Sequence, residues 1–560
     1  MEISKKKFTV EQISSIKSRW YGDNWPVVYI LNNSKEAYVG ETSRISSRLK
    51  QHLDNTKRMD LTHVNIIADD RFNKSAVLDI ESKLIEYMSA DDKYKLQNSN
   101  AGMRGHDYYE KKEYEAIFRH IWEELRRNKI VQHDLTLLEN SDLFKYTPYK
   151  TLTEEQYEVA FDICLELLGA MLENRPATFV VNGEAGTGKT VLAMYIMKLL
   201  TDGKLIEFVT EDDELIMEQY VSLQQKVEEL KICLVVPMTS LRKTLKNVVS
   251  KVSGLKSTMV VGPSDVLKDD YDIVIVDETH RLAQRVNLAN FAYFDKNNKE
   301  LGLSNEGTQL DWIMKRSRYQ IFFYDSGQSV RPGDIPQDKF EEIKDTSELY
   351  ITHTIKSQMR SMGGEDYLTY IKDLLNNKPD LEPKTFGDYD FLLFDQVSDM
   401  RDLIHLRDSE VGLSRLIAGY AWKWKTQHMS YLQIEQNNAY DIEIQEEKFI
   451  WNKSKIGWIN SKNAINEVGS IHTTQGYDLN YAGVIIGPEL KYNPITQKIY
   501  VDKDLYQDTN GKRSILNEDE LTDYITQIYR VLLTRSIKGT YLFISDPHLR
   551  EYFSKFVKLY

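Results

Sequence analysis

The sequence predicts an α/β protein in which a small N-terminal α/β domain precedes two larger domains built on parallel sheets. Two observations predict the parallel sheets. The segment GEAGTGKT (183–190) stands between a β-rich apolar run and a helix-forming run, and the apolar run 271–276 ends directly in Asp277 and Glu278. Both put polar groups at carboxyl ends of strands, the ligand edge of a parallel α/β sheet. Two strand-like runs near residue 30 predict a separate short sheet.

The glycine-rich segment fits G-x-x-x-x-G-K-[ST], the loop whose backbone N–H groups cradle nucleotide phosphates. Its glycines are Gly183, Gly186 and Gly188. Lys189 is expected to reach the β- and γ-phosphates, and Thr190 is expected to hold Mg²⁺. The order strand, loop, helix puts the phosphates at a helix N-terminus, so ATP is the expected ligand.

Other polar residues that follow strand-like runs extend this candidate site. Asp277 is expected to hold Mg²⁺ through water, and Glu278 to polarise the attacking water. Gln328 and Arg331 follow the run YQIFFYDSG, where a γ-phosphate sensor could couple hydrolysis to movement.

A second set of polar residues lies near the C-terminal end. Gln475 and Gly476 stand between two apolar segments in HTTQGYD and are expected to join the nucleotide site. YRVLLTR contains Arg530 and Arg535. A motor with two lobes needs an arginine from the second lobe to reach the nucleotide of the first, and Arg535 is the candidate.

The N-terminal region carries a different pattern of polar residues. After two short strands, 26–31 and 37–40, a helix presents Arg44, Arg48 and His52 at spacings of four, which suits either a phosphate clamp or a solvated face. On the next helix, Glu81 has apolar residues three and four positions away on both sides. Such a carboxylate is costly unless it is paired or binds a cation, and periodicity leaves both open.

These N-terminal residues resemble the GIY-YIG endonucleases in order and approximate spacing, through VVY at 27–29, YVG at 38–40, Arg48, His52, Glu81 and Asn98. Valines at 27, 28 and 39 depart from the family triplets. The resemblance implies that Glu81 ligates a divalent metal, Mg²⁺ or alternatively Mn²⁺, and that Tyr29 or Tyr38 helps to activate water. It also implies that Arg48 stabilises charge on the phosphate, with His52 assisting and Asn98 supporting the site.

Residues 146–560 resemble superfamily 1 helicases, and more closely the Schlafen-like helicases, through GEAGTGKT, VDETHR, DSGQSVRP, SQMRSMGGEDY, AGYAWKW, HTTQGYD and YRVLLTR. The resemblance implies two RecA-like domains with ATP in their cleft and nucleic acid across their tops. It implies that Gln156 reads the adenine edge and that Arg360 enters the cleft from the second domain. A strand through Tyr420–Lys425 would be aromatic on one face and basic on much of the other, which suits single-strand binding or core packing.

Composition and charge set further limits. The net charge of −13 argues against an overall basic nucleic-acid coat, although it allows a local groove. Cys164 and Cys233 lie in apolar surroundings and offer neither a metal cluster nor a disulfide framework. No apolar run is long enough for a membrane span and no signal-type apolar region follows the first residues, so the cytoplasm is the expected location.

Together these patterns predict a nuclease domain at 1–106, a helical connector at 107–145, and RecA-like domains at 146–340 and 341–560. The expected function is an ATP-dependent helicase or translocase coupled to a metal-dependent endonuclease in antiviral defence, acting on nucleic acid, with DNA preferred to RNA. The alternatives are a nucleotide-dependent sensor or assembly ATPase with a non-cleaving binding domain, or a DNA repair factor. A homo-oligomer or a partner protein is left open.

Overall fold

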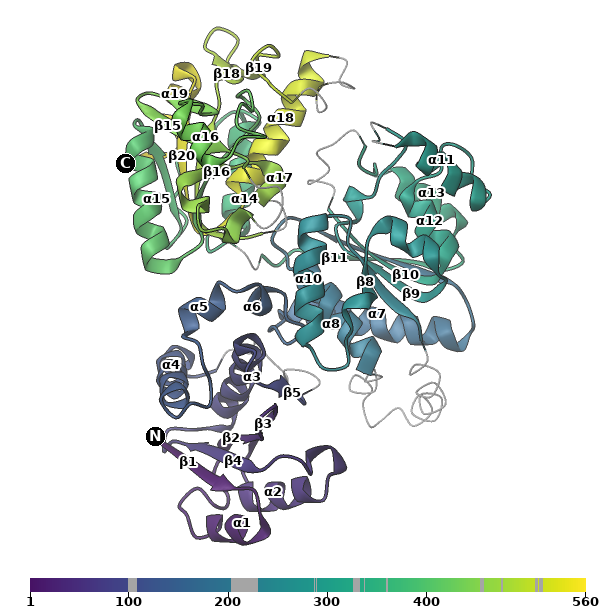
Figure 1. The fold of residues 1–560 in the computed structure, drawn as a ribbon, viewed down its shortest axis with the longest axis vertical. Coiled ribbons are helices and arrows are strands. Elements are labelled where there is room, and N and C mark those ends of the chain that lie inside the picture. Colours follow the sequence, from purple (N-terminus) through teal and green to yellow (C-terminus); the bar gives the residue numbers. More distant parts are fainter. Residues whose placement is uncertain are drawn as a thin grey trace.

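Four regions are visible along the chain: an N-terminal domain, a helical connector and two large lobes (Figure 1). The structure is a computed structural model, and it describes residues 1–98, 108–202, 230–286, 288, 290–325, 333–336, 338–358, 361–453, 458–474, 477–508, 512 and 517–560. No helix among these residues is long and apolar enough to cross a membrane.

The N-terminal domain is a five-stranded sheet in the order β1-β4-β2-β3-β5. Its elements are β1 (Glu2–Lys7), α1 (Val10–Ile16), β2 (Val27–Asn32), β3 (Glu36–Thr42), α2 (Ile45–Leu53), β4 (His63–Ala68), α3 (Lys74–Asp91) and β5 (Lys95–Leu96). β2 is buried along its whole length and pairs antiparallel with β3 and β4. Because side chains alternate across a strand, Val28 and Ile30 pack towards α3, whereas Tyr29 and Leu31 join α1 and α2. The predicted antiparallel sheet flanked by helices is present, except that the short β5 pairs parallel with β3.

The connector consists of α4 (Lys111–Arg127), α5 (Leu135–Glu139) and α6 (Asp142–Tyr146). The buried stripe of α4 includes Ile117, Ile121 and Trp122, and it belongs to the same apolar cluster as Leu84 of α3. That cluster continues without a break into the helices and strands of the first lobe. The N-terminal domain, the connector and the first lobe therefore share one core, and rigid packing of this kind transmits movement.

The first lobe is a six-stranded parallel sheet in the order β11-β6-β10-β9-β7-β8. Its elements are α7 (Glu154–Leu172), β6 (Ala177–Gly183), α8 (Lys189–Asp202), β7 (Ile232–Val235), α10 (Thr239–Lys251), β8 (Val260–Val261), β9 (Tyr271–Val276), α11 (Phe291–Glu300), α12 (Gln309–Arg316), β10 (Ser317–Tyr324), α13 (Asp338–Thr346) and β11 (Tyr350–Ile355). Because β11 pairs with β6, this lobe extends at least to Ile355, beyond the predicted boundary at residue 340.

The second lobe is an eight-stranded sheet in the order β14-β15-β16-β13-β17-β20-β12-β21, parallel except for the β14–β15 pair. Its elements are α14 (Gly364–Leu375), β12 (Asp390–Phe394), α15 (Val397–Val411), β13 (Ser414–Ala418), α16 (Tyr431–Gln436), β14 (Ile442–Ile444), β15 (Glu447–Trp451), β16 (Glu467–Gly469), α17 (Ile471–Thr474), β17 (Leu479–Ile486), β18 (Leu490–Asn493), β19 (Lys498–Val501), α18 (Glu518–Leu533), β20 (Ser536–Ile544), α19 (Pro547–Ser554) and β21 (Lys558–Leu559). β18 and β19 form a separate hairpin.

The segment after β13 differs from the strand that its alternating sequence suggested. β13 ends at Ala418, and Tyr420–Lys425 is irregular. Trp422 and Trp424 pack against an apolar cluster of the second lobe. These tryptophans therefore pack against the core of the second lobe. Burial of a large aromatic ring stabilises this arrangement more than the weak strand preference of a short alternating sequence stabilises a strand.

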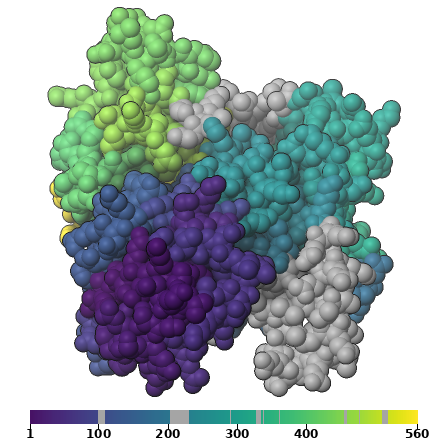
Figure 2. Space-filling model, turned by 60° about the horizontal axis from the view of Figure 1, so that its bottom comes forward, coloured from purple at the N-terminus to yellow at the C-terminus, as the bar shows by residue number. Residues whose placement is uncertain are grey.

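The N-terminal domain and the connector lie against both lobes. In Figure 2 the purple-to-blue part of the chain is in contact with the green second lobe above it and the teal first lobe beside it.

Candidate functional site

The glycine loop joins the buried strand β6 to α8, and three of its positions need glycine. A Cβ at Gly183 would lie 2.6 Å from the Thr187 hydroxyl, and Gly186 and Gly188 have φ angles of +88° and +76°. Other residues are strained in this left-handed region. α8 begins at Lys189, so the loop ends on a helix N-terminus, which attracts phosphate.

Lys189 is buried, and its ammonium is satisfied inside the protein. Nζ donates to the carbonyl oxygens of Gly183 at 2.6 Å and Glu184 at 2.8 Å, and it pairs with the Asp325 carboxylate at 3.0 Å. Asp325 directly follows β10, the strand beside β6. The sequence analysis missed this residue, although an acid directly after an apolar strand is the same signal that identified Asp277.

Thr190 and Asp277 meet as predicted. The Thr190 hydroxyl donates a 2.7 Å hydrogen bond to the Asp277 carboxylate. Burial, reinforced by the charge of Glu278, raises the pKa of Asp277 to about 7. A divalent cation would offset this cost, and hydroxyl and carboxylate oxygens are hard ligands, so this donor set fits Mg²⁺.

Glu278 is held in an unusual backbone conformation, with a φ of +51°. The nearest oxygen of its carboxylate is 2.9 Å from His280 Nε2. Burial acts to raise the pKa of Glu278, but His280 and Lys189 outweigh burial, so this pKa lies below its ordinary value. Glu278 is therefore ionised, which polarising a water molecule requires. The sequence analysis did not single out His280.

One arginine of the second lobe contacts the glycine loop. Arg530 Nη2, on α18, lies 3.3 Å from the Glu184 carboxylate. A small cleft there is lined by residues of both lobes, namely Glu184, Ala185, Asp325, Leu368, Arg530, Val531 and Thr534. Arg535 is 2% exposed. Arg530 is thus the arginine seen at the loop in this conformation, and the role of Arg535 stays a prediction.

Gln156 is fully buried beneath the loop. Its amide nitrogen donates to the Thr187 carbonyl at 2.6 Å, and its oxygen accepts from the backbone N–H of Thr153 at 3.1 Å, which caps α7. The amide therefore ties α7 to the phosphate loop, and adenine recognition by Gln156 stays a prediction.

Several predicted residues lie outside the described part of the chain: Gln328, Arg331, Arg360, Gln475 and Gly476. Within it, Gln358, two positions before Arg360, donates a 2.9 Å hydrogen bond to the Ala185 carbonyl of the glycine loop. The segment that joins the lobes therefore contacts the candidate nucleotide site.

The N-terminal domain brings four of its predicted residues together. The Tyr29 hydroxyl lies 2.8 Å from His52 Nε2, and the Tyr38 and His52 ring centroids are 5.1 Å apart. Burial lowers the pKa of His52 to about 4, with help from the charge of Arg48. Burial also acts on Arg48, but Tyr29 and Tyr38 outweigh it and raise the pKa of this guanidinium. The imidazole is therefore neutral near pH 7 and the arginine is charged.

Gly40 is the reason that these rings can approach β3 so closely. A Cβ at this position would lie 2.4 Å from the Tyr29 hydroxyl and 3.0 Å from Tyr38 Cε1. Only glycine leaves room for both tyrosines.

Glu81 and Asn98 border this cluster from other elements. Glu81, on α3, is half-buried and acts electrostatically on Tyr29. Asn98 makes both of its amide hydrogen bonds to the backbone of Val39, at 3.0 and 2.9 Å. Asn98 therefore fixes β3, which agrees with a supporting role.

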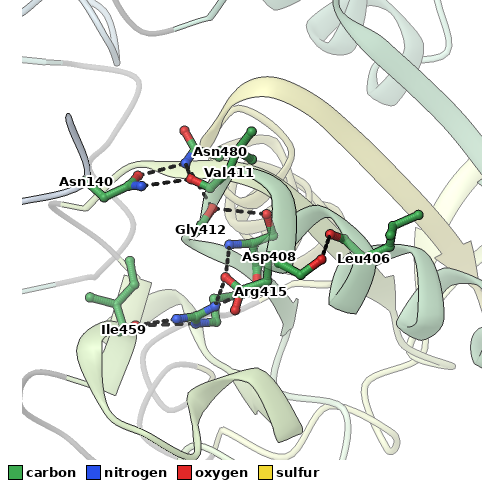
Figure 3. Close-up of polar contacts among 10 residues, drawn as sticks. Asn140, Leu406, Asp408, Val411, Gly412, Arg415, Ile459 and Asn480 are labelled. Carbon is green, nitrogen blue, oxygen red and sulfur yellow. Dashed lines mark hydrogen bonds and ion pairs between the residues drawn. The ribbon is translucent and has the colours of Figure 1, made fainter. Parts of the chain in front are cut away.

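The connector also reaches the second lobe. Asn140 Nδ2 donates to the Val411 carbonyl at 2.8 Å, and Asn480 Nδ2 donates to Asn140 Oδ1 at 2.8 Å (Figure 3). Lys145 Nζ donates to the Asp478 carbonyl at 3.2 Å. Because the connector shares its core with the first lobe, these contacts link the two lobes through the connector.

Comparison with known proteins shows that most of the chain matches a helicase-domain family. The family model described as Schlafen group 3, DNA/RNA helicase domain, matches residues 176–546. An uncharacterized protein of Saccharomyces cerevisiae, YPL245W, is 26% identical over 407 residues, which are 67% of this chain and 83% of that protein.

Solved helicase structures are more distant. The Pif1 helicase from Candida albicans is 11% identical, with 70% of this chain and 94% of that chain covered and a TM-score of 0.27. The Bacteroides Pif1 helicase in complex with ADP-AlF3 and ssDNA is 11% identical, with 70% and 92% covered and a TM-score of 0.25. At these TM-scores the structural likenesses carry no weight beside the family match.

Proposed function

Because this chain belongs to the Schlafen group 3 DNA/RNA helicase-domain family, we propose that it is an ATP-dependent nucleic-acid helicase or translocase coupled to a metal-dependent GIY-YIG endonuclease. The motor proposal rests above all on one observation: the 2.7 Å Thr190–Asp277 hydrogen bond, beside buried Lys189, joins the two predicted halves of a nucleotide site.

The motor residues divide the work as follows. Lys189 binds the β- and γ-phosphates, and Thr190 and Asp277 hold Mg²⁺, which neutralises phosphate charge when bound. Ionised Glu278 orients and polarises the attacking water. Arg530 and Arg535 come from the second lobe, and an arginine there senses the nucleotide across the cleft.

The nuclease proposal rests on the cluster of Tyr29, Tyr38, Arg48 and His52. Neutral His52 accepts a hydrogen bond from the Tyr29 hydroxyl and orients it, and charged Arg48 stabilises the phosphate. Glu81 holds the metal, which acts as a Lewis acid on phosphate oxygens when bound. The described residues contain no group of three or more His, Cys, Asp or Glu side chains suited to a metal. One carboxylate completed by water and phosphate fits Mg²⁺, with Mn²⁺ as the alternative.

The substrate class follows from this pairing of activities. A motor that moves along nucleic acid delivers strands to a phosphodiester-cleaving domain, and DNA is the substrate that we propose first. Destruction of foreign nucleic acid in antiviral defence is the corresponding role. Loss of protection against viral challenge in cells that carry Glu81→Ala, with protection by the unchanged chain, tests that role.

The deciding experiment incubates the chain with single- and double-stranded DNA and RNA, with and without ATP and Mg²⁺. Glu81→Ala should abolish cleavage and spare ATPase activity, and Lys189→Ala should abolish ATPase activity. Asp79→Ala is the matched control, because Asp79 lies on the same helix and pairs with Lys83. Cleavage that persists in Glu81→Ala removes the nuclease assignment. Nucleic-acid-stimulated ATPase without any cleavage favours a sensor with a non-cleaving domain.

A further inference from the structure

Arg58 is a cationic residue beside the tyrosine cluster that no sequence motif singles out. It ends a short 3-10 turn, Thr56–Arg58, after α2. Its guanidinium carbon lies 3.5 Å from the centroid of the Tyr38 ring. Nη1 donates a 2.9 Å hydrogen bond to Gln97 Oε1, and Gln97 in turn donates at 2.7 Å to Glu36. Stacking on one side and a hydrogen bond on another fix the plane of this guanidinium.

The charges around Arg58 are of its own sign. In the described part of the chain, the buried Nε of Arg58 has no hydrogen-bond partner. Burial lowers the pKa of Arg58, and the charge of Arg48 lowers it further. The charges of Arg48 and Arg58 also lower the pKa of His52. The half-buried Arg58 and the exposed Arg48 thus both act on one neutral imidazole, and a bound anion would offset this repulsion.

We propose that Arg58 is a second phosphate-binding arginine of the N-terminal site, contacting the same phosphodiester as Arg48 in a bound nucleic-acid strand. This inference rests on the proposed nuclease function. Gln97 accepts a hydrogen bond from Nη1 of Arg58, and the Tyr38 ring covers one face of the guanidinium. Nη2 makes no hydrogen bond to the described residues, so its N–H groups are available to a phosphate oxygen. Guanidinium forks match phosphate geometry. Attack on phosphorus increases the negative charge on the non-bridging oxygens, so two arginines can each stabilise a different oxygen.

A cleavage assay tests this role with a matched control. Arg58→Ala should lower kcat/KM for cleavage by about 100- to 1000-fold, the range for one lost transition-state donor. Lys57→Ala removes an exposed cation from the same turn and should change cleavage little. Arg58→Lys should restore only part of the loss, and added ethylguanidinium should partly rescue Arg58→Ala. A purely structural arginine gives no such rescue.

A second measurement tests whether Arg58 binds phosphate without requiring cleavage. The chain is labelled with phenylglyoxal in the presence and absence of the dinucleotide TpT, and peptides are analysed by mass spectrometry. TpT should protect Arg58 and Arg48 and leave Arg126, which lies on the distant α4, unprotected.

The two measurements separate the two proposals. If the unchanged chain cuts, but Arg58→Ala cuts equally well and TpT does not protect Arg58, the inference is overturned and the nuclease stands. If the unchanged chain does not cut, the nuclease proposal fails. Protection by TpT then decides alone whether Arg58 binds phosphate.

Discussion

Lys189 and Asp325 form a buried ion pair at 3.0 Å in which the lysine of the phosphate loop is neutralised by an acid from the neighbouring strand β10. The same ammonium also donates to two loop carbonyls. A nucleotide phosphate would therefore compete with Asp325 and these two carbonyl oxygens for the Lys189 ammonium.

Asp325→Asn should show that Asp325 and the nucleotide phosphate compete for Lys189. The change leaves the buried Lys189 charge without its partner, so stability should fall by about 3–5 kcal/mol, as for other broken buried pairs. ATP phosphates can supply the missing negative charge, so the rise in Tm on adding Mg²⁺-ATP should be larger than for the unchanged chain. Asp202→Asn is the control, because it breaks the Lys198–Asp202 pair of the same helix away from the loop. An ATP-induced shift no larger than the control's would contradict the prediction.

Gly40→Ala should abolish the proposed nuclease activity and spare the ATPase activity. The new Cβ would lie 2.4 Å from the Tyr29 hydroxyl, so the tyrosine must leave its place beside His52. Displacement of a reacting group by about 1 Å can cost about 100-fold in rate. Cleavage and ATPase rates measured on one preparation check this, and Gly169→Ala, which meets no atom within 4 Å, is the control. Normal cleavage by Gly40→Ala would contradict a role of Tyr29 in the cleavage reaction.

Asn140 and Asn480 should show energetic coupling. Each contacts the other, and both donate to the Val411 carbonyl, so single replacements by alanine disturb one shared network. A double-mutant cycle on the first urea transition should give a coupling energy of about 0.5–3 kcal/mol. Additive effects would mean that this contact does not tie the connector to the second lobe. Asn437→Ala, on an exposed helix end, is the control.

Glu489 should make the second lobe less stable as pH rises from 5 to 7. Burial raises the pKa of this carboxyl from 4.5 to about 7, so the folded chain keeps a proton that the unfolded chain has lost. Stability then falls by up to about 1.4 kcal/mol for each pH unit in this window.

Glu489→Gln should remove most of that slope, because the amide keeps a hydrogen bond to the Tyr529 hydroxyl without a titratable proton. Urea unfolding monitored from pH 5 to 7 compares the two chains. An unchanged slope in the variant would assign the effect to another group.

The local motifs were accessible to sequence reasoning because their chemistry is carried by neighbouring residues. The glycine loop, the acids after β9 and the order of the helicase blocks could all be recognised, and the family match covers those blocks. The antiparallel N-terminal sheet was also predicted. For Tyr420–Lys425 the sequence left single-strand binding and core packing open, and Trp422 and Trp424 pack against the second lobe. The boundary at residue 340 was wrong, because β11 pairs with β6.

The sequence by itself therefore determined the parallel α/β core and the helicase family, and it predicted a phosphate loop with Thr190 and Asp277. Only the tertiary structure decided that Asp325 neutralises Lys189, that Arg530 faces Glu184, that Asn140 joins Asn480, and that Arg58 stacks on Tyr38. The physical reason is that these contacts join elements brought together by strand order and a shared apolar core. Neither spacing nor composition encodes which distant side chains then meet.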